Sequence, residues 1–220
     1  MHNFKAAIFD LDGTLIDSMD IWSKIDEEYL KSFGLEVPDN IQKEITHLSL
    51  TETAKYFKDK FDIKDSINSI IDKWNSMAFN YYSNNISLKE GVLDYLKQLK
   101  ENNIKIALAT SNSVKLLEVT LKNNGIYEYF DAISTSDEVK KSKENPDIYL
   151  LSAKKLNVDP KDCIVFEDIP KAVKGAKLAG MTVVAVYDKS SEDSKEELIQ
   201  LSDKYIYDFN ELIIKQKVSI

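Results

Sequence analysis

The chain has 220 residues, and its 37 acidic side chains against 29 basic ones give a formal net charge of −8. All the basic side chains are lysines, so the sequence contains no arginine, which is the side chain best suited to bidentate recognition of phosphate. Any bound anion must therefore be held by lysine, by backbone amides or by a metal ion, and the acidic balance argues against nucleic acid as a partner.

The composition is that of an ordinary globular protein, with 43% hydrophobic and 30% charged residues. The single cysteine, Cys163, excludes an internal disulfide and fits a reducing compartment. No apolar run approaches the roughly 20 residues that a membrane helix needs, and the N-terminal residues do not resemble a signal peptide. We therefore expect a soluble, cytoplasmic protein, a monomer, that binds neither membranes nor nucleic acid.

The first predicted element is a buried strand at residues 5–10, where an apolar run is closed by an acid and a glycine turn. From residue 18 to residue 84 the sequence changes to helical patterns that predict four helices and no convincing strand. Ser18 and Asp20 are candidate caps of the first helix, which Gly34 ends.

After residue 88 the predicted helices and strands alternate. The strands are 104–110, 132–134, 163–166 and 182–186, the helices are 88–102, 114–124, 146–156 and 170–180, and the tail adds a helix, a short strand near Tyr205 and a final helix. This alternation predicts a parallel sheet covered on both faces. The predicted fold class is α/β: a Rossmann-like parallel-sheet core formed by residues 1–15 and 88–220, with residues 16–87 inserted as a helical bundle.

Polar side chains capable of chemistry follow several of the predicted strands. They are Asp10, Asp12, Thr110, Lys143, Glu167 and Asp168. In open α/β sheets the binding site lies outside the carboxyl ends of the strands, so these side chains are expected to gather at one edge. Helix caps on a solvated rim would explain one or two of the acids. They explain poorly an acidic pair after each of two buried strands.

The charges of this predicted cluster indicate its ligand. Carboxylates within a few ångströms repel one another by roughly 4 kcal/mol per close pair at an effective dielectric constant of about 20. Lys143 alone cannot offset four carboxylates, especially beside an anionic substrate. A divalent cation can, and an all-oxygen set of ligands suits Mg²⁺ better than zinc or copper.

These residues resemble the haloacid dehalogenase superfamily of phosphatases and phosphomutases. Its four motifs are similar, in order, to Asp10-Leu11-Asp12-Gly13-Thr14, to Thr110 at the end of Ile-Ala-Leu-Ala-Thr, to Lys143 before Pro146-Asp147-Ile148-Tyr149, and to Glu167-Asp168. The helical insertion stands where the β-phosphoglucomutase-like subfamily has its cap. Lys140 and Lys141 lie near Lys143, and the assignment of Lys143 rests on its distance from Pro146.

The resemblance implies a role for each matching residue. Asp10 would attack phosphorus to form an aspartyl-phosphate, and Asp12 would act as the general acid and base. Phosphate would be held by side chains of the second and third motif regions, namely Thr110, Ser111, Asn112 and Lys143. The Mg²⁺ cofactor would be bound by residues of the first and fourth motifs, namely Asp10, Asp12 (through its main-chain carbonyl), Glu167 and Asp168.

Substrate choice would be set by the cap. The subfamily's mutases carry a histidine and an arginine at cap positions that correspond here to Trp22 and Leu50. A mutase needs a second phosphate-binding site in its cap. The absence of arginine therefore favours hydrolysis of a small phosphorylated metabolite, most plausibly a sugar phosphate. Trp22 and His47 are candidate substrate contacts, although Trp22 could instead belong to the cap core and His47 could be solvated.

Two alternatives to a phosphatase remain open from the sequence. The first is a sugar phosphomutase of the β-phosphoglucomutase type. The second is a non-catalytic phosphoacceptor module, because receiver domains also gather acids, threonine and lysine on a parallel sheet. Asp12 and the helical insertion argue against the second, since a signalling module needs neither.

Overall fold

A computed structural model describes residues 4–38, 41–45, 50–84, 86–139 and 141–213 of the chain. The chain divides into two compact units, one comprising Met1–Met19 with Ile86–Ile220 and the other comprising Asp20–Asn85. No helix in the described ranges combines the length and the apolar character that a membrane span requires.

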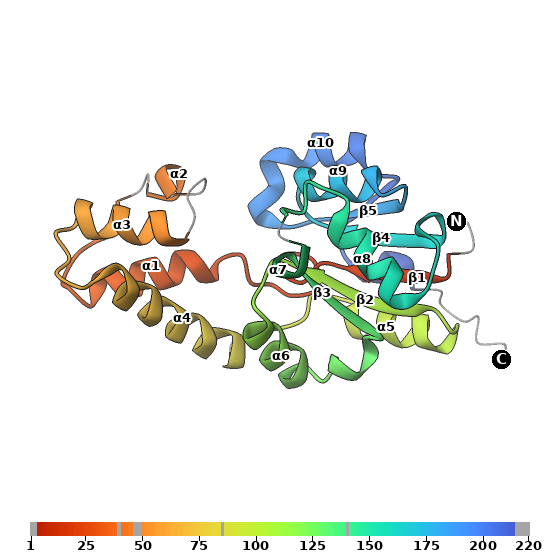
Figure 1. The fold of residues 1–220 in the computed structure, drawn as a ribbon, viewed down its shortest axis with the longest axis horizontal. Helices are drawn as coiled ribbons and strands as arrows, with labels where there is room; N and C mark the ends of the chain where they lie inside the picture. Colours follow the sequence, from red (N-terminus) through yellow and green to blue (C-terminus); the bar gives the residue numbers. More distant parts are fainter. Residues whose placement is uncertain (1–3, 39–40, 46–49, 85, 140, 214–220) are drawn as a thin grey trace. The chain divides into compact units, whose positions relative to one another are not determined.

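The first unit is built on a parallel sheet, which has six strands among the described residues, in the order β3-β2-β1-β4-β5-β6 (Figure 1). The strands are β1 (Ala6–Phe9), β2 (Lys105–Thr110), β3 (Ala132–Thr135), β4 (Cys163–Glu167), β5 (Thr182–Val186) and β6 (Lys204–Ile206). Every neighbouring pair is parallel, which confirms the predicted fold class. Because β1 lies between β2 and β4, the carboxyl ends of these three strands meet at one edge.

Helices connect the strands and cover both faces of the sheet (Figure 1). The α-helices of this unit are α5 (Val92–Glu101), α6 (Val114–Asn123), α7 (Ser136–Val139), α8 (Asp147–Leu156), α9 (Pro170–Leu178) and α10 (Lys195–Leu201). Short 3₁₀ turns are η1 (Tyr127–Tyr129), η2 (Pro160–Asp162), η3 (Lys189–Ser194) and η4 (Phe209–Leu212). The predicted final helix is therefore, in the described residues, only the turn η4.

The alternation of side chains along β1 places apolar groups on both faces of the sheet. Ile8 belongs to a buried cluster that includes Val173 of α9. The next residue, Phe9, stacks on Phe166 of β4 with ring centroids 4.5 Å apart. Tyr95 of α5 packs edge-on against both of these rings. The strands beneath the site are thus buried on both sides, which holds their carboxyl ends in place.

Helix α5 begins later than the sequence predicts, at Val92 instead of residue 88. Gly91 precedes it with a left-handed φ of 78°, which glycine adopts without strain. Upstream, Leu88 forms an antiparallel bridge with Ile16, and the Lys89 amide donates to the Leu15 carbonyl at 2.9 Å. The long-range pairing of these two linker segments competes successfully with helix formation there.

The second unit is helical in its described residues. Its helices are α1 (Ile21–Lys31), α2 (Ile41–Ile45), α3 (Leu50–Lys60) and α4 (Ile67–Asn84). Trp74 of α4 is buried and packs edge-on against Tyr29 of α1 and Phe57 of α3, with ring centroids 5.6 and 5.0 Å apart. The prediction that Asp20 caps α1 is wrong, because its side chain makes no capping hydrogen bond.

Candidate active site

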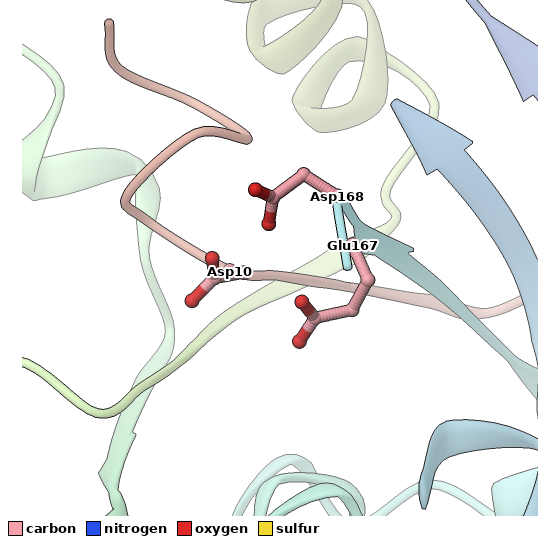
Figure 2. Close-up of side chains that lie close together, drawn as sticks. All are labelled: Asp10, Glu167 and Asp168. Carbon is pink, nitrogen blue, oxygen red and sulfur yellow. The ribbon is translucent and has the colours of Figure 1, made fainter. Parts of the chain in front are cut away.

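The sheet edge brings three carboxylates together. Asp10 directly follows β1, Glu167 ends β4, and Asp168 follows it. One carboxylate oxygen from each lies within 4.8 Å of the others, and Figure 2 shows the three side chains around a common space. All three residues are buried, with exposed fractions of 7%, 1% and 2%. The neighbouring strands β1 and β4 thus gather the acids that the sequence predicted for one site.

Lys143 is the cation of this cluster. Its Nζ donates to Asp10 Oδ1 at 2.6 Å and lies 2.5 Å from Glu167 Oε1. Burial alone would lower the pKa of the ammonium, but the two carboxylates raise that pKa above its ordinary value. The loop that carries Lys143 packs directly on α9: a Cβ at Gly175 would lie 1.9 Å from the Lys143 carbonyl oxygen. Lys143 therefore remains charged and fixed between two acids.

One lysine does not neutralise three buried acids. Burial raises the pKa of Asp10 although Lys143 lowers it, and burial raises the pKa of Glu167 to about 7. The pKa of Asp168 is raised well above its usual value by burial and then by the charges of Asp10 and Glu167. Burial is the main cause of all three raised pKa values, and Lys143 does not offset it, so keeping the three carboxylates ionised is costly unless a further cation is bound.

The cluster fits a hard divalent cation. Within the described part of the chain, Glu167 Oε2 and Asp168 Oδ2 are buried and have no hydrogen-bond partner. A buried carboxylate oxygen without a partner is costly, and such oxygens in native proteins point to a ligand. Carboxylate oxygens are the ligands that Mg²⁺ prefers. Asp10, Glu167 and Asp168 are thus suited to hold Mg²⁺.

The turn after Asp10 is shaped around Asp168. Gly13 has a φ of 77°, and a Cβ on it would lie 2.3 Å from Asp168 Oδ2, so only glycine fits. The next residue, Thr14, is fully buried and donates from Oγ1 to Asp168 Oδ1 at 3.3 Å. The first and fourth motifs are thereby joined by direct contact.

The Asp12 carboxylate is not part of the three-acid cluster and has hydrogen-bond donors of its own. Its Oδ1 accepts a 2.7 Å hydrogen bond from Ser18 Oγ, and its Oδ2 accepts a 2.9 Å bond from Asn112 Nδ2. Two donors fix the orientation of this carboxylate beside Asp10. The expectation that the main-chain carbonyl of Asp12 ligates the metal stays a prediction.

The predicted phosphate-binding residues after β2 differ in their surroundings. Thr110 is buried, and its Oγ1 accepts a 2.9 Å bond from the Asn112 amide. Ser111 is exposed, with its Oγ 2.9 Å from Ser136 Oγ. The Asn112 side chain, by contrast, bonds Asp12. The turn thus links the second motif to the first.

Trp22 and His47 are the two predicted cap contacts. Trp22 lies on α1 of the helical unit and is 37% exposed, so it is not fully buried in that unit's core. His47 lies outside the described residues.

Sequence reasoning missed two side chains at the site. Ser18, interpreted as a helix cap, bonds Asp12, and the hydroxyl of Tyr149 lies 2.8 Å from Glu167 Oε1 and 3.1 Å from the Ala172 carbonyl oxygen. A hydroxyl residue just past the first motif and a tyrosine three residues past Pro146 were the available signals. Neither pattern predicts which distant carboxylate the hydroxyl meets.

Comparison with known proteins places the site among related sequences and structures. Residues 7–186 match the family described as haloacid dehalogenase-like hydrolases. A phosphorylated carbohydrates phosphatase of Thermotoga maritima is 30% identical over 191 residues, which are 87% of this chain and 88% of that protein. Hexitol phosphatase B of Escherichia coli is 27% identical over 216 residues, 96% of this chain and 95% of that protein.

This chain is also similar to a solved structure. One from Thermotoga maritima, provisionally assigned as a beta-phosphoglucomutase, has a TM-score of 0.83 and 28% identity, covering 92% of this chain and 94% of that one. The similarity covers 92% of this chain and therefore includes residues of both units.

Proposed function

The chain belongs to the haloacid dehalogenase-like hydrolase family, and we propose that it is a Mg²⁺-dependent phosphatase acting on a small phosphorylated metabolite through an aspartyl-phosphate. One observation supports the proposal: Oδ1 of Asp10, the residue that would attack phosphorus, lies 2.6 Å from Lys143 Nζ, and carboxylate oxygens of Asp10, Glu167 and Asp168 lie within 4.8 Å of one another. The carboxylate that would act as nucleophile thus adjoins a fixed cation and two acids that could hold a divalent metal.

In the first step, a carboxylate oxygen of Asp10 forms a bond to phosphorus and the bond from phosphorus to the ester oxygen breaks. Asp12 gives its proton to the departing oxygen. In the second step, Asp12 takes a proton from water, the water oxygen attacks phosphorus, and the bond to Asp10 breaks. Free phosphate leaves, and Asp12 is protonated again for the next cycle.

The neighbouring side chains orient these steps. Lys143 and Thr110 would hold phosphoryl oxygens, with Ser111 and Asn112 from the same turn. Bound Mg²⁺ would neutralise the charge between the nucleophile and the phosphoryl group and align the two. Ser18 and Asn112 donate to the two carboxylate oxygens of Asp12 and would set its orientation for these proton transfers.

A phosphorylated carbohydrate is the substrate class that we propose. The named activities of the two similar phosphatases, on phosphorylated carbohydrates and hexitol phosphate, support that choice. The residues that would choose among such substrates belong to the inserted helical segment, 16–87, with Trp22 and His47 as the candidates.

A sugar phosphomutase is the second candidate, because a similar solved structure carries that assignment. A mutase must grip a second phosphate, and this chain has no arginine with which to do so. Supplying glucose 1-phosphate with a bisphosphate primer separates the two: a phosphatase releases inorganic phosphate, whereas a mutase forms glucose 6-phosphate faster than phosphate.

The proposal is tested with p-nitrophenyl phosphate and Mg²⁺. Asp10→Asn removes the nucleophile and should lower turnover at least about a thousandfold, because the reaction has no other covalent acceptor. Asp94→Asn on the exposed face of α5 is the matched control and should keep wild-type turnover. Retained turnover in Asp10→Asn would refute the assignment of the nucleophile.

A further inference from the structure

Lys89 lies at a largely buried junction beside the turn that contains Gly13. Among the described residues, its Nζ donates to the carbonyl oxygens of Gly13 and Tyr187 and pairs with Asp188 Oδ2 at 2.7 Å. The side chains of Lys89 and Asp188 are only 14% and 5% exposed. An ammonium has three protons to donate, and here three oxygen atoms are available to accept them. The junction joins three segments that are distant in the sequence.

The charge of this junction is compensated locally. Asp188 also accepts bonds from the Ser190 amide at 2.8 Å and from Ser190 Oγ at 2.6 Å. Although burial acts to raise the pKa of Asp188, the bonds from Lys89 and Ser190 lower it below its ordinary value. Breaking a buried pair by removing one partner leaves the other charge uncompensated, so Lys89 and Asp188 depend on each other.

The Gly13 carbonyl connects the junction to the acids. Fixing that oxygen fixes the peptide plane between Gly13 and Thr14, because the peptide bond is planar. Thr14 Oγ1 donates to Asp168 Oδ1, and Gly13 has no room for even a Cβ beside Asp168. A small rotation of this peptide would therefore move a donor of Asp168 or press on its carboxylate.

We propose that Lys89 is a positioning residue that fixes the Gly13 carbonyl and thereby holds Asp168 in the orientation needed to bind the metal. The inference rests on the proposed function, in which Asp168 is a Mg²⁺ ligand. Within the described part of the chain, no hydrogen bond or ion pair joins Lys89 to Asp10, Glu167 or Asp168, so Lys89 acts through the Gly13–Thr14 peptide and the charge of Asp188. Outer residues that orient metal ligands typically change metal affinity or activity about tenfold to a hundredfold when they are lost.

The test compares Lys89→Met with wild type and with Lys97→Met, a control at an exposed lysine of α5 whose partner in the described residues is Asp94. Mg²⁺ alone is titrated by isothermal calorimetry well below the melting temperature, and kcat and KM are measured with p-nitrophenyl phosphate. Lys89→Met should weaken Mg²⁺ binding and lower kcat at limiting Mg²⁺ about tenfold to a hundredfold with little change in KM. Lys97→Met should match wild type in both measurements.

A purely structural role for Lys89 gives a different result. The variant would then melt at a lower temperature but, while folded, bind Mg²⁺ and turn over substrate as wild type does, and this outcome overturns the inference. If Lys89→Met does not fold, Asp188→Asn replaces it, since it withdraws the anion that centres the ammonium without changing the size of the side chain. Wild-type Mg²⁺ affinity in Asp188→Asn would likewise overturn the inference.

Failure of the proposed function is recognised separately in the wild-type arm. If wild-type protein binds Mg²⁺ but releases no phosphate, the proposed phosphatase activity is rejected. The Mg²⁺ titrations still decide whether Lys89 positions Asp168. If wild-type protein binds no Mg²⁺, both the proposed function and the inference built on it are rejected.

Discussion

The side-chain amide of Asn112 donates a 2.9 Å hydrogen bond to the carboxylate of Asp12, a residue 100 positions earlier in the chain. The turn after β2 therefore reaches the residue proposed as the acid and base. With Ser18 on the other carboxylate oxygen at 2.7 Å, Asp12 is oriented from two sides.

Asn112→Ala should lower kcat about tenfold to a hundredfold, because the loss of one donor lets the Asp12 carboxylate rotate away from its working position. Steady-state kinetics with a sugar phosphate measure the effect. Asn102→Ala serves as the control, because in the described residues the exposed Asn102 side chain bonds the Gln98 carbonyl at the end of α5. An unchanged kcat in Asn112→Ala would show that Ser18 alone is sufficient.

Asp12→Asn should separate the two chemical steps. A leaving group as good as p-nitrophenolate needs little protonation, so Asp10 can still be phosphorylated, but no base activates the water that follows. We expect a burst of p-nitrophenol equal to the enzyme concentration and then very slow turnover, as seen when a covalent intermediate accumulates. Steady release without a burst, at the wild-type rate, would remove Asp12 from the mechanism.

Asp168→Asn should stabilise the metal-free protein while abolishing stabilisation by Mg²⁺. Burial and the charges of Asp10 and Glu167 raise the pKa of Asp168, so its ionised form costs folding free energy at neutral pH. The amide removes that charge at nearly constant shape. Melting curves with EDTA test the stability of the metal-free variant, and melting curves with Mg²⁺ test whether the metal stabilises it. Mg²⁺ raises the melting temperature only of a protein that binds it when folded. A Mg²⁺-dependent rise equal to that of wild type would contradict the ligand assignment.

Asp203 should contribute stability that disappears in acid. Its Oδ2 accepts the Val183 amide at 2.7 Å and it pairs with Lys177; although burial opposes this, these partners lower the pKa of Asp203 below its ordinary value. A group with a depressed folded-state pKa stabilises above the unfolded-state pKa, and this contribution is lost as the pH falls through the folded-state pKa.

Asp203→Asn is therefore expected to cost about 1 kcal/mol at pH 7, and the difference from wild type should shrink as the pH falls below about 4. Urea unfolding of the variant and of wild type between pH 3 and pH 7 measures this difference in free energy of unfolding. Asp94→Asn, whose carboxylate is on the surface of α5, controls for general charge effects. A cost that does not vary with pH would mean that the hydrogen bond does not depend on ionisation.

The features that the sequence predicted well are those with local or repeated signals. Apolar runs and alternating helices indicated a parallel sheet, because such strands must be buried on both faces. The acids at the ends of β1 and β4 and the four-motif resemblance indicated the site, and the family match over residues 7–186 confirms that resemblance.

The features that escaped prediction depend on contacts between distant segments. A serine shortly before a predicted helix is typical of a helix cap, yet the Ser18 hydroxyl bonds Asp12. The sequence predicts a helix from residue 88, but the Lys89 amide bonds the Leu15 carbonyl and the Lys89 ammonium pairs with Asp188, and helix α5 begins only at Val92. Local propensity is worth only a few tenths to about 1 kcal/mol per residue, so contacts with distant segments can override it.

The most direct measurement of the central claim is the location of the phosphoryl group during turnover. Wild-type protein is mixed with substrate and Mg²⁺, quenched in acid and reduced with borohydride, which converts an aspartyl-phosphate to homoserine, and the peptides are then sequenced by mass spectrometry. We predict homoserine at position 10, and none in protein to which no substrate was added. Homoserine at another position, or phosphate release without any such modification, would contradict Asp10 as the residue that carries the phosphoryl group.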